Sequence, residues 1–421
     1  MLNFLGEVVV SSKSVDFNPY HSAAASTTPV QTAATSASQF VPASAPGRHP
    51  TDASMRTPNS QLRIDKRTSG APHTVIRGQY TGNEFHLVGT LNEAETQSAF
   101  SKTGIPSLGK LVLGTGSARV RLAYYDDRES GKQVWVAVKK MTDIDVAYIE
   151  IERHLDVQRS LPESLFVVKL IDYAITEGKD KKSKAYLFME WSNPGYQIMN
   201  TTKKDKVCAE HFYGGQADLA GFVNHASQFP FYGSCSAQEA VRKVAWACVA
   251  AVNDFHKAGL VHRDIKSENF YCNHSGQVKL GDYASVGLRS DSALSSAGWT
   301  PQSVPYHILK EIGSQAIDKI ALTWSAQELD RFALGRTLLD LRTYCLHLNE
   351  QRLVVSKQNT AISTKKVLRN GCFVECWVGF SVDPASIRGD TLDEVIALLM
   401  YNEPGGRTVD QISRSPYFTS F

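Results

Sequence analysis

The sequence predicts an α+β protein of two lobes, the first rich in strands and the second rich in helices. Three observations lead to this prediction. Short runs of apolar and β-branched residues fill the segments 74–140 and 166–190 and are typical of strands. From about residue 194 onward, apolar residues recur at helical spacing. With 421 residues, 42% of them hydrophobic, the chain can bury one large or two medium cores.

Residues 1–72 have a different composition and are expected to form a disordered N-terminal extension. The stretch 21–54 is mainly Ser, Thr, Ala and Pro, so it cannot bury enough apolar surface to offset its chain entropy. A linker or tail is the simpler interpretation of this leader. The alternative is a secretion or targeting signal that delivers the protein into a host cell, since uncharged Ser-rich N-termini also occur on injected bacterial effectors.

The overall composition argues against several classes of protein. A net charge of +3 is too balanced for nucleic acid as the main partner. No apolar run approaches the roughly 18–20 residues of a membrane span. The seven cysteines are scattered, and Cys372 and Cys376 have no second close pair with which to form a zinc site. We therefore expect a soluble, cytoplasmic protein with reduced cysteines.

Three helices are predicted from apolar stripes. They span 143–161, 237–259 and 327–346. The second ends at Gly259, a residue suited to the end of a helix. The expected stripes are Ile144, Tyr148, Ile151 and Leu155 in the first helix, and Val241, Val244, Cys248, Val252 and Phe255 in the second.

A Gly-rich turn containing Gly114 and Gly116 lies between two predicted strands. Glycines allow backbone N–H groups to approach phosphate oxygens that a Cβ would obstruct. An ordinary β-turn is the simpler explanation, because a third glycine is missing and Val120 comes one residue earlier than a G-x-G-x-x-G-x-V pattern would place it.

Lys139 stands at the end of the apolar strand VWVAVKK. Such a lysine usually extends to solvent. The functional alternative is a positive charge that binds the α and β phosphates of a nucleotide and is held by an acid on the following helix. Glu150 and Glu152 are the candidates. We prefer Glu152, because Leu155, three residues later, resumes the apolar pattern.

The segment 259–272, GLVHRDIKSENFYC, carries the strongest functional signal. A surface turn is the alternative, but the spacing favours phosphoryl transfer. Asp264 can accept the proton of an attacking hydroxyl, and Lys266 can stabilise the transferred phosphoryl group. The side-chain oxygen of Asn269 can bind Mg²⁺, and Asp282 follows as a second candidate ligand.

The order of these motifs resembles that of the eukaryotic-type protein kinases, over roughly residues 105–421. The resemblance implies a bilobal protein-kinase-like fold, with a β-rich N-lobe over 105–191 and an α-helical C-lobe over 192–421. The segment 73–104 would then be an extension that packs on the kinase. The matching motifs are VAVK at 136–139, HRDIKSEN at 262–269 and DYA at 282–284.

The resemblance also implies ATP and Mg²⁺ as cofactors and assigns residues to them. The segment YLFMEWS resembles the connection between the lobes, where the backbone C=O of Glu190 and N–H of Ser192 would bind adenine. Tyr271 takes the place of the smaller residue that usually forms the floor of the adenine site. The implied nucleotide-binding residues are Gly114, Gly116, Val120, Ala137, Lys139, Met189, Glu190, Ser192 and Tyr271.

Later segments agree with the resemblance, although some features depart from it. Asp330 in DRFALG is implied to hold the backbone of the catalytic loop, and Arg407 is implied to be structural, with Glu311 or alternatively Glu328 as its partner.

Two further features depart from the resemblance. The usual Ala-Pro-Glu motif is absent. Ala284 replaces a hinge glycine, where we expect it to resist a positive φ by roughly 1–2 kcal/mol.

The sequence therefore predicts a protein serine/threonine kinase that acts on protein substrates, with Lys266 typical of the Ser/Thr-specific subgroup. A nucleotide-binding scaffold that signals by conformation is the alternative. Transfer to a small molecule fits the motifs less well. Arg263 implies that a charged group in the following segment orders the site, with five hydroxyls there as candidate phosphorylation sites: Ser290, Ser292, Ser295, Ser296 and Thr300.

Overall fold

The structure is a computed structural model in which parts of the chain between residues 75 and 420 are described. These residues belong to one unit that begins at Met55. The predicted leader, 1–72, lies outside them. The described ranges are 75–87, 90–91, 109–110, 112–115, 119–128, 130–177, 183–192, 198–199, 212–213, 218–291, 294, 299–312, 324–369 and 372–420.

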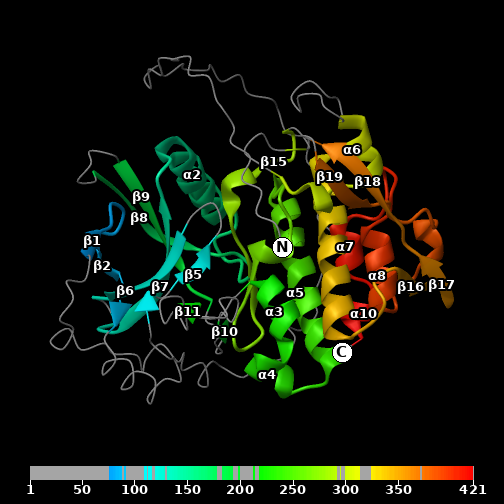
Figure 1. Cartoon of the computed structure of the whole chain (residues 1–421), viewed down its shortest axis with the longest axis horizontal. Coiled ribbons are helices and arrows are strands. Elements are labelled where there is room, and N and C mark those ends of the chain that lie inside the picture. The colour runs from blue at the N-terminus through cyan, green and yellow to red at the C-terminus, as the bar shows by residue number, and fades with distance from the viewer. Residues whose placement is uncertain are drawn as a thin grey trace, which may run out of the picture. The chain divides into compact units, whose positions relative to one another are not determined.

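The main sheet of the first lobe (Figure 1) has nine strands among the described residues. The strand order is β10-β11-β5-β6-β7-β9-β8, with β2 paired to β6 and β1 paired to β2. Val, Tyr and Trp side chains fit such a pleated, half-buried surface. The strands are β1 (Val75–Arg77), β2 (Glu84–Leu87), β5 (Val112–Thr115), β6 (Arg119–Asp126), β7 (Gln133–Met141), β8 (Leu170–Glu177), β9 (Ser183–Glu190), β10 (Ile198–Met199) and β11 (Phe212–Tyr213), while β3 (Thr90–Leu91) and β4 (Gly109–Lys110) pair separately.

Helix α2 (Ile144–Ser160) packs against β8 and β9, and its buried face differs from the predicted one. Asp143 caps its N-terminus by accepting the Val146 N–H. Tyr148 was expected in the apolar stripe, but it is 50% exposed. Two polar residues take core positions, which a template that counts only apolar residues cannot identify. The buried residues are Ala147, Glu150, Ile151, His154 and Val157.

The second lobe is helical and is organised around two long helices, α5 and α7, as predicted (Figure 1). The expected stripe of α5 is fully buried, and Gly259 follows the helix with a φ of 75°. Ser325 and Glu328 form a capping box at the start of α7. The helices are α3 (Leu219–His225), α4 (Pro230–Gly233), α5 (Ala237–Lys257), α6 (Tyr306–Ile312), α7 (Ala326–Cys345), α8 (Leu392–Leu399), α9 (Val409–Ser413) and α10 (Pro416–Thr419).

Two β-hairpins follow α7, in a region where the sequence predicted no element. They are β16 (Arg352–Val355) with β17 (Gln358–Ala361), and β18 (Thr364–Arg369) with β19 (Cys372–Trp377). Strand β19 lies against the short helix η5 (Pro301–Ser303), and Lys365 of β18 lies over the Tyr306 ring of α6. The second hairpin therefore braces the segment that leads into α6.

Neither a membrane-crossing helix nor a disulfide occurs in the described part of the chain. No described helix is long and apolar enough to cross a membrane. The six cysteines within the described ranges are all free.

The predicted partners of Arg407 do not pair with it. Arg407 forms no ion pair with Glu311 or Glu328, although all three residues are described. Glu328 instead accepts the Gly405 N–H.

Strands β1 and β2, which precede the first predicted kinase residue, are part of the main sheet. Phe85 on β2 is 0% exposed, and its ring stacks on that of Phe188 with centroids 3.7 Å apart. The turn between the two strands is also held, since the Asp172 carboxylate accepts the backbone N–H groups of Tyr80 and Thr81 at 2.9 and 3.0 Å. Residues 75–87 therefore contribute to the core of the first lobe.

Phe85→Ala should destabilise the protein by about 3–5 kcal/mol, because it removes a fully buried ring and its stacking partner loses contact. Urea unfolding of the full chain measures the change. Tyr80→Ala is the matched control, since Tyr80 is 74% exposed in the adjoining turn. A Phe85→Ala variant as stable as the control would show that β1 and β2 do not belong to the folded core.

Candidate active site

The loop that carries the main sequence motif is held at its start by a carboxylate from α7. The chain leaves β12 (Leu260–Val261) and passes directly into His262. Asp330 accepts the backbone N–H groups of His262 and Arg263, both at 2.7 Å, as the resemblance implied. Arg263 has a φ of 65°, in the left-handed region that non-glycine residues rarely adopt. Two charge-assisted hydrogen bonds thus fix the backbone one residue before Asp264.

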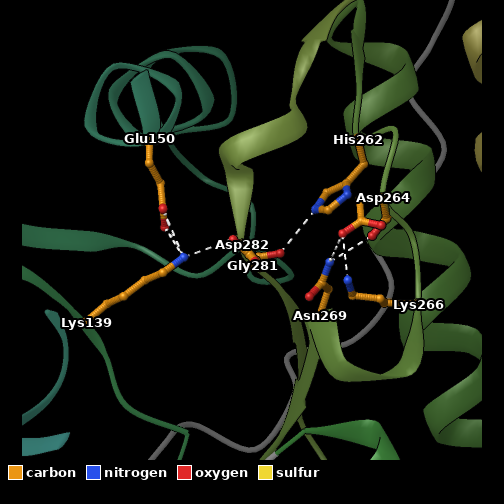
Figure 2. Close-up of polar contacts among 8 residues, drawn as sticks. All are labelled: Lys139, Glu150, His262, Asp264, Lys266, Asn269, Gly281 and Asp282. Atoms are coloured by element: carbon orange, nitrogen blue, oxygen red, sulfur yellow. Dashed lines mark hydrogen bonds and ion pairs between the residues drawn. The ribbon is translucent and has the colours of Figure 1, made fainter. Parts of the chain in front are cut away.

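The predicted residues of this loop converge on the Asp264 carboxylate (Figure 2). Lys266 Nζ lies 2.8 Å from Asp264 Oδ2. The Asn269 amide nitrogen donates to the Asp264 backbone carbonyl at 2.8 Å. Thr300 also reaches this centre: its hydroxyl donates to Asp264 Oδ1 at 2.7 Å and accepts from Lys266 at 3.3 Å. Sequence reasoning treated Thr300 only as a phosphorylation candidate, and no local spacing links it to Asp264.

Asp282 follows strand β14 (Val278–Leu280) and faces Lys139 from the second lobe (Figure 2). The two side chains form an ion pair of 3.1 Å. Asp282 has a φ of 61°, whereas Ala284 lies in the short helix η4 (Tyr283–Ser285) and has no positive φ. The expected strain at Ala284 is therefore wrong: the left-handed residue is the aspartate itself.

Lys139 on β7 pairs with Glu150, not with the preferred candidate Glu152. Lys139 Nζ lies 2.7 and 2.9 Å from the two Glu150 oxygens (Figure 2). Glu150 is buried and Glu152 is exposed on the same helix. The preference failed because the true buried face of α2 is rotated from the predicted apolar stripe, so Glu150 points to the sheet and Glu152 to solvent.

The electrostatics of this cluster keep its lysine charged and its aspartate ionised. Burial of Lys139 disfavours its charge, but Asp282 and Glu150 outweigh burial and raise its pKa. Burial would also raise the pKa of Asp282, but Lys139, His262 and Lys266 outweigh it and lower that pKa. The cluster therefore offers both a cation and an anion at neutral pH.

Asn269 and Asp282 are suited to hold a hard divalent cation. The Asn269 amide nitrogen is used by Asp264, which leaves the amide oxygen to accept or ligate. Asp282 binds Lys139 through Oδ1, so its second oxygen remains. Carboxylate and amide oxygens are the ligands that Mg²⁺ prefers, and the donor set fits that ion.

The predicted nucleotide-binding residues lie on neighbouring strands. Across β7 and β9, Ala137 is paired with Met189, and across β6 and β7, Val120 is paired with Lys139. Directly paired residues face the same side of a sheet. Gly114 is paired in turn with Val120, while Gly116 lies outside the described residues. These pairings place one row of the predicted residues beside Lys139.

The remaining predicted contacts flank the junction of the two lobes. Glu190 ends β9, and its carboxylate pairs with Lys279 of β14 at 2.5 Å. Ser192 follows two residues later and is half-buried. Tyr271, on β13 (Phe270–Cys272), lies against Gly281, where an added Cβ would come within 2.9 Å of the ring. Only glycine leaves room for Tyr271 immediately before Asp282.

His154 is a buried polar residue that the sequence did not single out. Its ring lies 4.5 Å from that of Tyr283, measured between centroids. Neither of its ring nitrogens has a hydrogen-bond partner among the described residues. Burial, and then the Lys139 charge, lower the pKa of His154 to about 3, although Asp282 acts in the opposite direction. The neutral imidazole of His154 therefore packs α2 against Tyr283, the residue that follows Asp282.

Comparison with known proteins gives one family match over most of the chain. A family model described as the protein kinase domain matches residues 110–418. CBL-interacting protein kinase 30 of Oryza sativa subsp. japonica is 23% identical over 331 residues, which cover 77% of this chain and 56% of that protein. Serine/threonine-protein kinase Nek3 of Mus musculus is 41% identical over 61 residues, 14% of this chain and 12% of that protein. The matched regions therefore cover at most 56% of the length of either relative.

His154→Leu should make stability less dependent on pH. The imidazole has a pKa of about 6.5 when unfolded, so below that pH the unfolded state binds a proton that the folded state excludes. Stability is therefore lost as pH falls from 6.5, and the parent protein loses about 2 kcal/mol from this residue between pH 8 and pH 5. Urea unfolding at both pH values measures the loss, which the leucine variant should lack. Equal pH dependence of the two proteins would contradict a neutral His154.

Proposed function

The chain belongs to the protein kinase family, and from this premise we propose that it transfers the γ-phosphate of ATP to Ser or Thr hydroxyls of protein substrates, with Mg²⁺ as the metal. The family match agrees with the predicted α+β bilobal fold, which the strand-rich first lobe and helical second lobe confirm. The family as such uses ATP and a divalent metal. The choice of Mg²⁺ and of Ser/Thr acceptors belongs to the proposal.

The observation that carries this proposal is the presence of two clusters of charged side chains, one around Asp264 and one around Asp282 (Figure 2). Asp264 and Lys266 come from the loop after β12, and Lys139 comes from the sheet of the other lobe. Phosphoryl transfer needs positioned charges rather than covalent chemistry from the protein. Every charge that the reaction requires is present in this chain.

Each side chain has a distinct role in the proposed reaction. The Asp264 carboxylate accepts the proton of the substrate hydroxyl, a role supported by the hydrogen bond that it already accepts from the Thr300 hydroxyl. Lys266 stabilises the negative charge on the phosphoryl oxygens in transfer, and Lys139 orients the phosphates that remain. Asn269 and Asp282 would hold Mg²⁺, which supplies additional positive charge to the phosphates when bound.

Two observations support Ser or Thr as the residue whose hydroxyl receives the phosphate. Lys266 lies within hydrogen-bond distance of both Asp264 and Thr300, so a lysine, a carboxylate and a threonine hydroxyl form one connected group. Several relatives are named as serine/threonine-protein kinases, among them Nek3 and testis-specific serine/threonine-protein kinase 5 of Mus musculus, the latter 31% identical over 126 residues, 29% of this chain and 33% of that protein.

Asp264→Asn should lower the rate of phosphate transfer by about 10²–10⁴-fold, because the amide cannot accept the hydroxyl proton. The measurement uses labelled ATP and Mg²⁺ with the full chain, and counts label on the chain itself and on casein. Phosphoamino acid analysis should find label on Ser and Thr. Equal incorporation by the parent and Asp264→Asn would refute the proposal. Stabilisation of the parent by ATP without any transfer would favour a nucleotide-binding scaffold.

Glu150→Gln should lower kcat/KM by about 10²-fold, because Lys139 loses the carboxylate that positions it and a displacement of about 1 Å suffices for such a loss. Glu152→Gln is the matched control: it makes the same change two residues away on the exposed face of α2, and should retain the parent rate. The assay is initial-rate transfer to casein at varied ATP. The reverse ranking of the two variants would mean that α2 turns its other face to Lys139 in the working enzyme.

A further inference from the structure

Arg263 directs its guanidinium at the segment that follows Asp282. Its Nε donates to the Ser285 carbonyl at 2.7 Å, and its Nη2 donates to the Val286 carbonyl at 3.2 Å. Arg263 immediately precedes Asp264, and its own N–H is held by Asp330. The side chain therefore ties the segment after the predicted metal ligand to the loop that carries the predicted base.

Asp291 lies near the same guanidinium, across the space that a Gly287 Cβ would occupy. A Cβ placed on Gly287 would collide with both Arg263 Nη2 and Asp291 Oδ2, so the two charged groups lie on either side of that one position. Asp291 is held there by its own turn. Its Oδ2 accepts the Leu288 N–H at 2.9 Å, and its backbone N–H donates to the Leu288 carbonyl at 3.0 Å.

This turn also sits beside the catalytic loop through a short strand pair. Strand β15 (Gly287–Leu288) pairs antiparallel with β12, with Leu260 opposite Leu288 and Val261 opposite Gly287. Strand β12 ends directly before His262. A charge that holds the turn at Asp291 therefore acts on the backbone that positions Asp264.

The groups around Arg263 act in opposite directions on its pKa. Burial, the largest influence, lowers the pKa of Arg263, and the nearby Arg153 of α2 lowers it further. Asp291 and Asp330 act in the opposite direction. Asp330 already accepts two backbone N–H groups and contacts His256 at 3.2 Å, so Asp291 is the carboxylate available in the segment itself.

We propose that Asp291 supplies the negative charge that holds Arg263 and the catalytic loop in place, so that the segment 286–299 needs no phosphorylation for activity. The proposal rests on the proposed kinase function. In kinases generally, a phosphate added to this segment orders it by pairing with arginine. Here a carboxylate at a fixed turn provides charge of the same sign from the unmodified chain. Phosphates on the neighbouring serines would then be unnecessary for the transfer reaction.

The activity test uses the full chain co-expressed with a phosphatase and shown by intact mass to carry no phosphate. A variant in which Ser290, Ser292, Ser295 and Ser296 are all Ala should transfer phosphate to casein within about twofold of the parent. Adding Asp291→Asn to that variant should lower the initial rate at least about tenfold, because the amide keeps the Leu288 hydrogen bond but removes the charge. Asp145→Asn, an exposed acid on α2, is the matched control. A tenfold loss in the four-alanine variant, or an unchanged rate with Asp291→Asn, would overturn the proposal.

Hydrogen exchange provides a readout that does not depend on catalysis. In the unmodified chain without ATP, Asp291→Asn should speed exchange of the Arg289 amide, which donates to the Gly259 carbonyl beside β12, at least about tenfold, whereas Asp145→Asn should not. Unchanged exchange in Asp291→Asn would overturn the role of Asp291 even in an active enzyme. A parent protein that transfers no phosphate to casein or to itself would refute the kinase function instead, and the exchange result would still decide whether Asp291 orders the loop.

Discussion

One buried carboxylate, that of Asp330, fixes the loop on which the rest of the site depends. It is 1% exposed and accepts the N–H groups of His262 and Arg263, while His256 of α5 lies 3.2 Å away. A buried charge costs several kcal/mol unless its oxygens are satisfied by donors. These donors come from α5 and the catalytic loop, so the Asp330 carboxylate links α5, α7 and the loop to one another. The position of Asp264 follows from that arrangement.

The ion pairs of Lys139 make a second constraint, which joins the two lobes. One ammonium group contacts Glu150 of α2 and Asp282 after β14, although these residues are far apart in sequence. The orientation of α2 and the conformation of Asp282 are thereby coupled through a single cation. His154 adds a packing link between the same two elements, because it lies one helical turn after Glu150 and its ring packs at a tilt against that of Tyr283. The lobes are thus connected by both charge and packing.

Local patterns predicted much of the fold and of the site, and long-range geometry supplied what they missed. The spacing of Asp264, Lys266 and Asn269 along one loop predicted a shared function, and Lys266 and Asn269 both contact Asp264. Short runs of apolar and β-branched residues identified the main strands, and helical spacing identified α5. Glu150 was ranked below Glu152 because a periodic template assumes that buried positions are apolar. The bond of Thr300 to Asp264 was not predicted, because it spans 36 residues and no sequence period reports such a contact.

Backbone strain in this site lies at Arg263 and Asp282, and not at Ala284, where the sequence suggested it. Arg263 and Asp282 both adopt left-handed φ angles, at roughly 1–2 kcal/mol each for a non-glycine residue. Such conformations persist only where the surroundings over-determine them. For Arg263 the surroundings are Asp330 and the carbonyls of Ser285 and Val286, and for Asp282 they include Lys139. Ala284 is an ordinary helical residue in η4, so a glycine there would relieve no strain and would only add freedom to the unfolded chain. The alanine is therefore compatible with the proposed site, because the conformation that positions the proposed metal ligand is adopted two residues earlier.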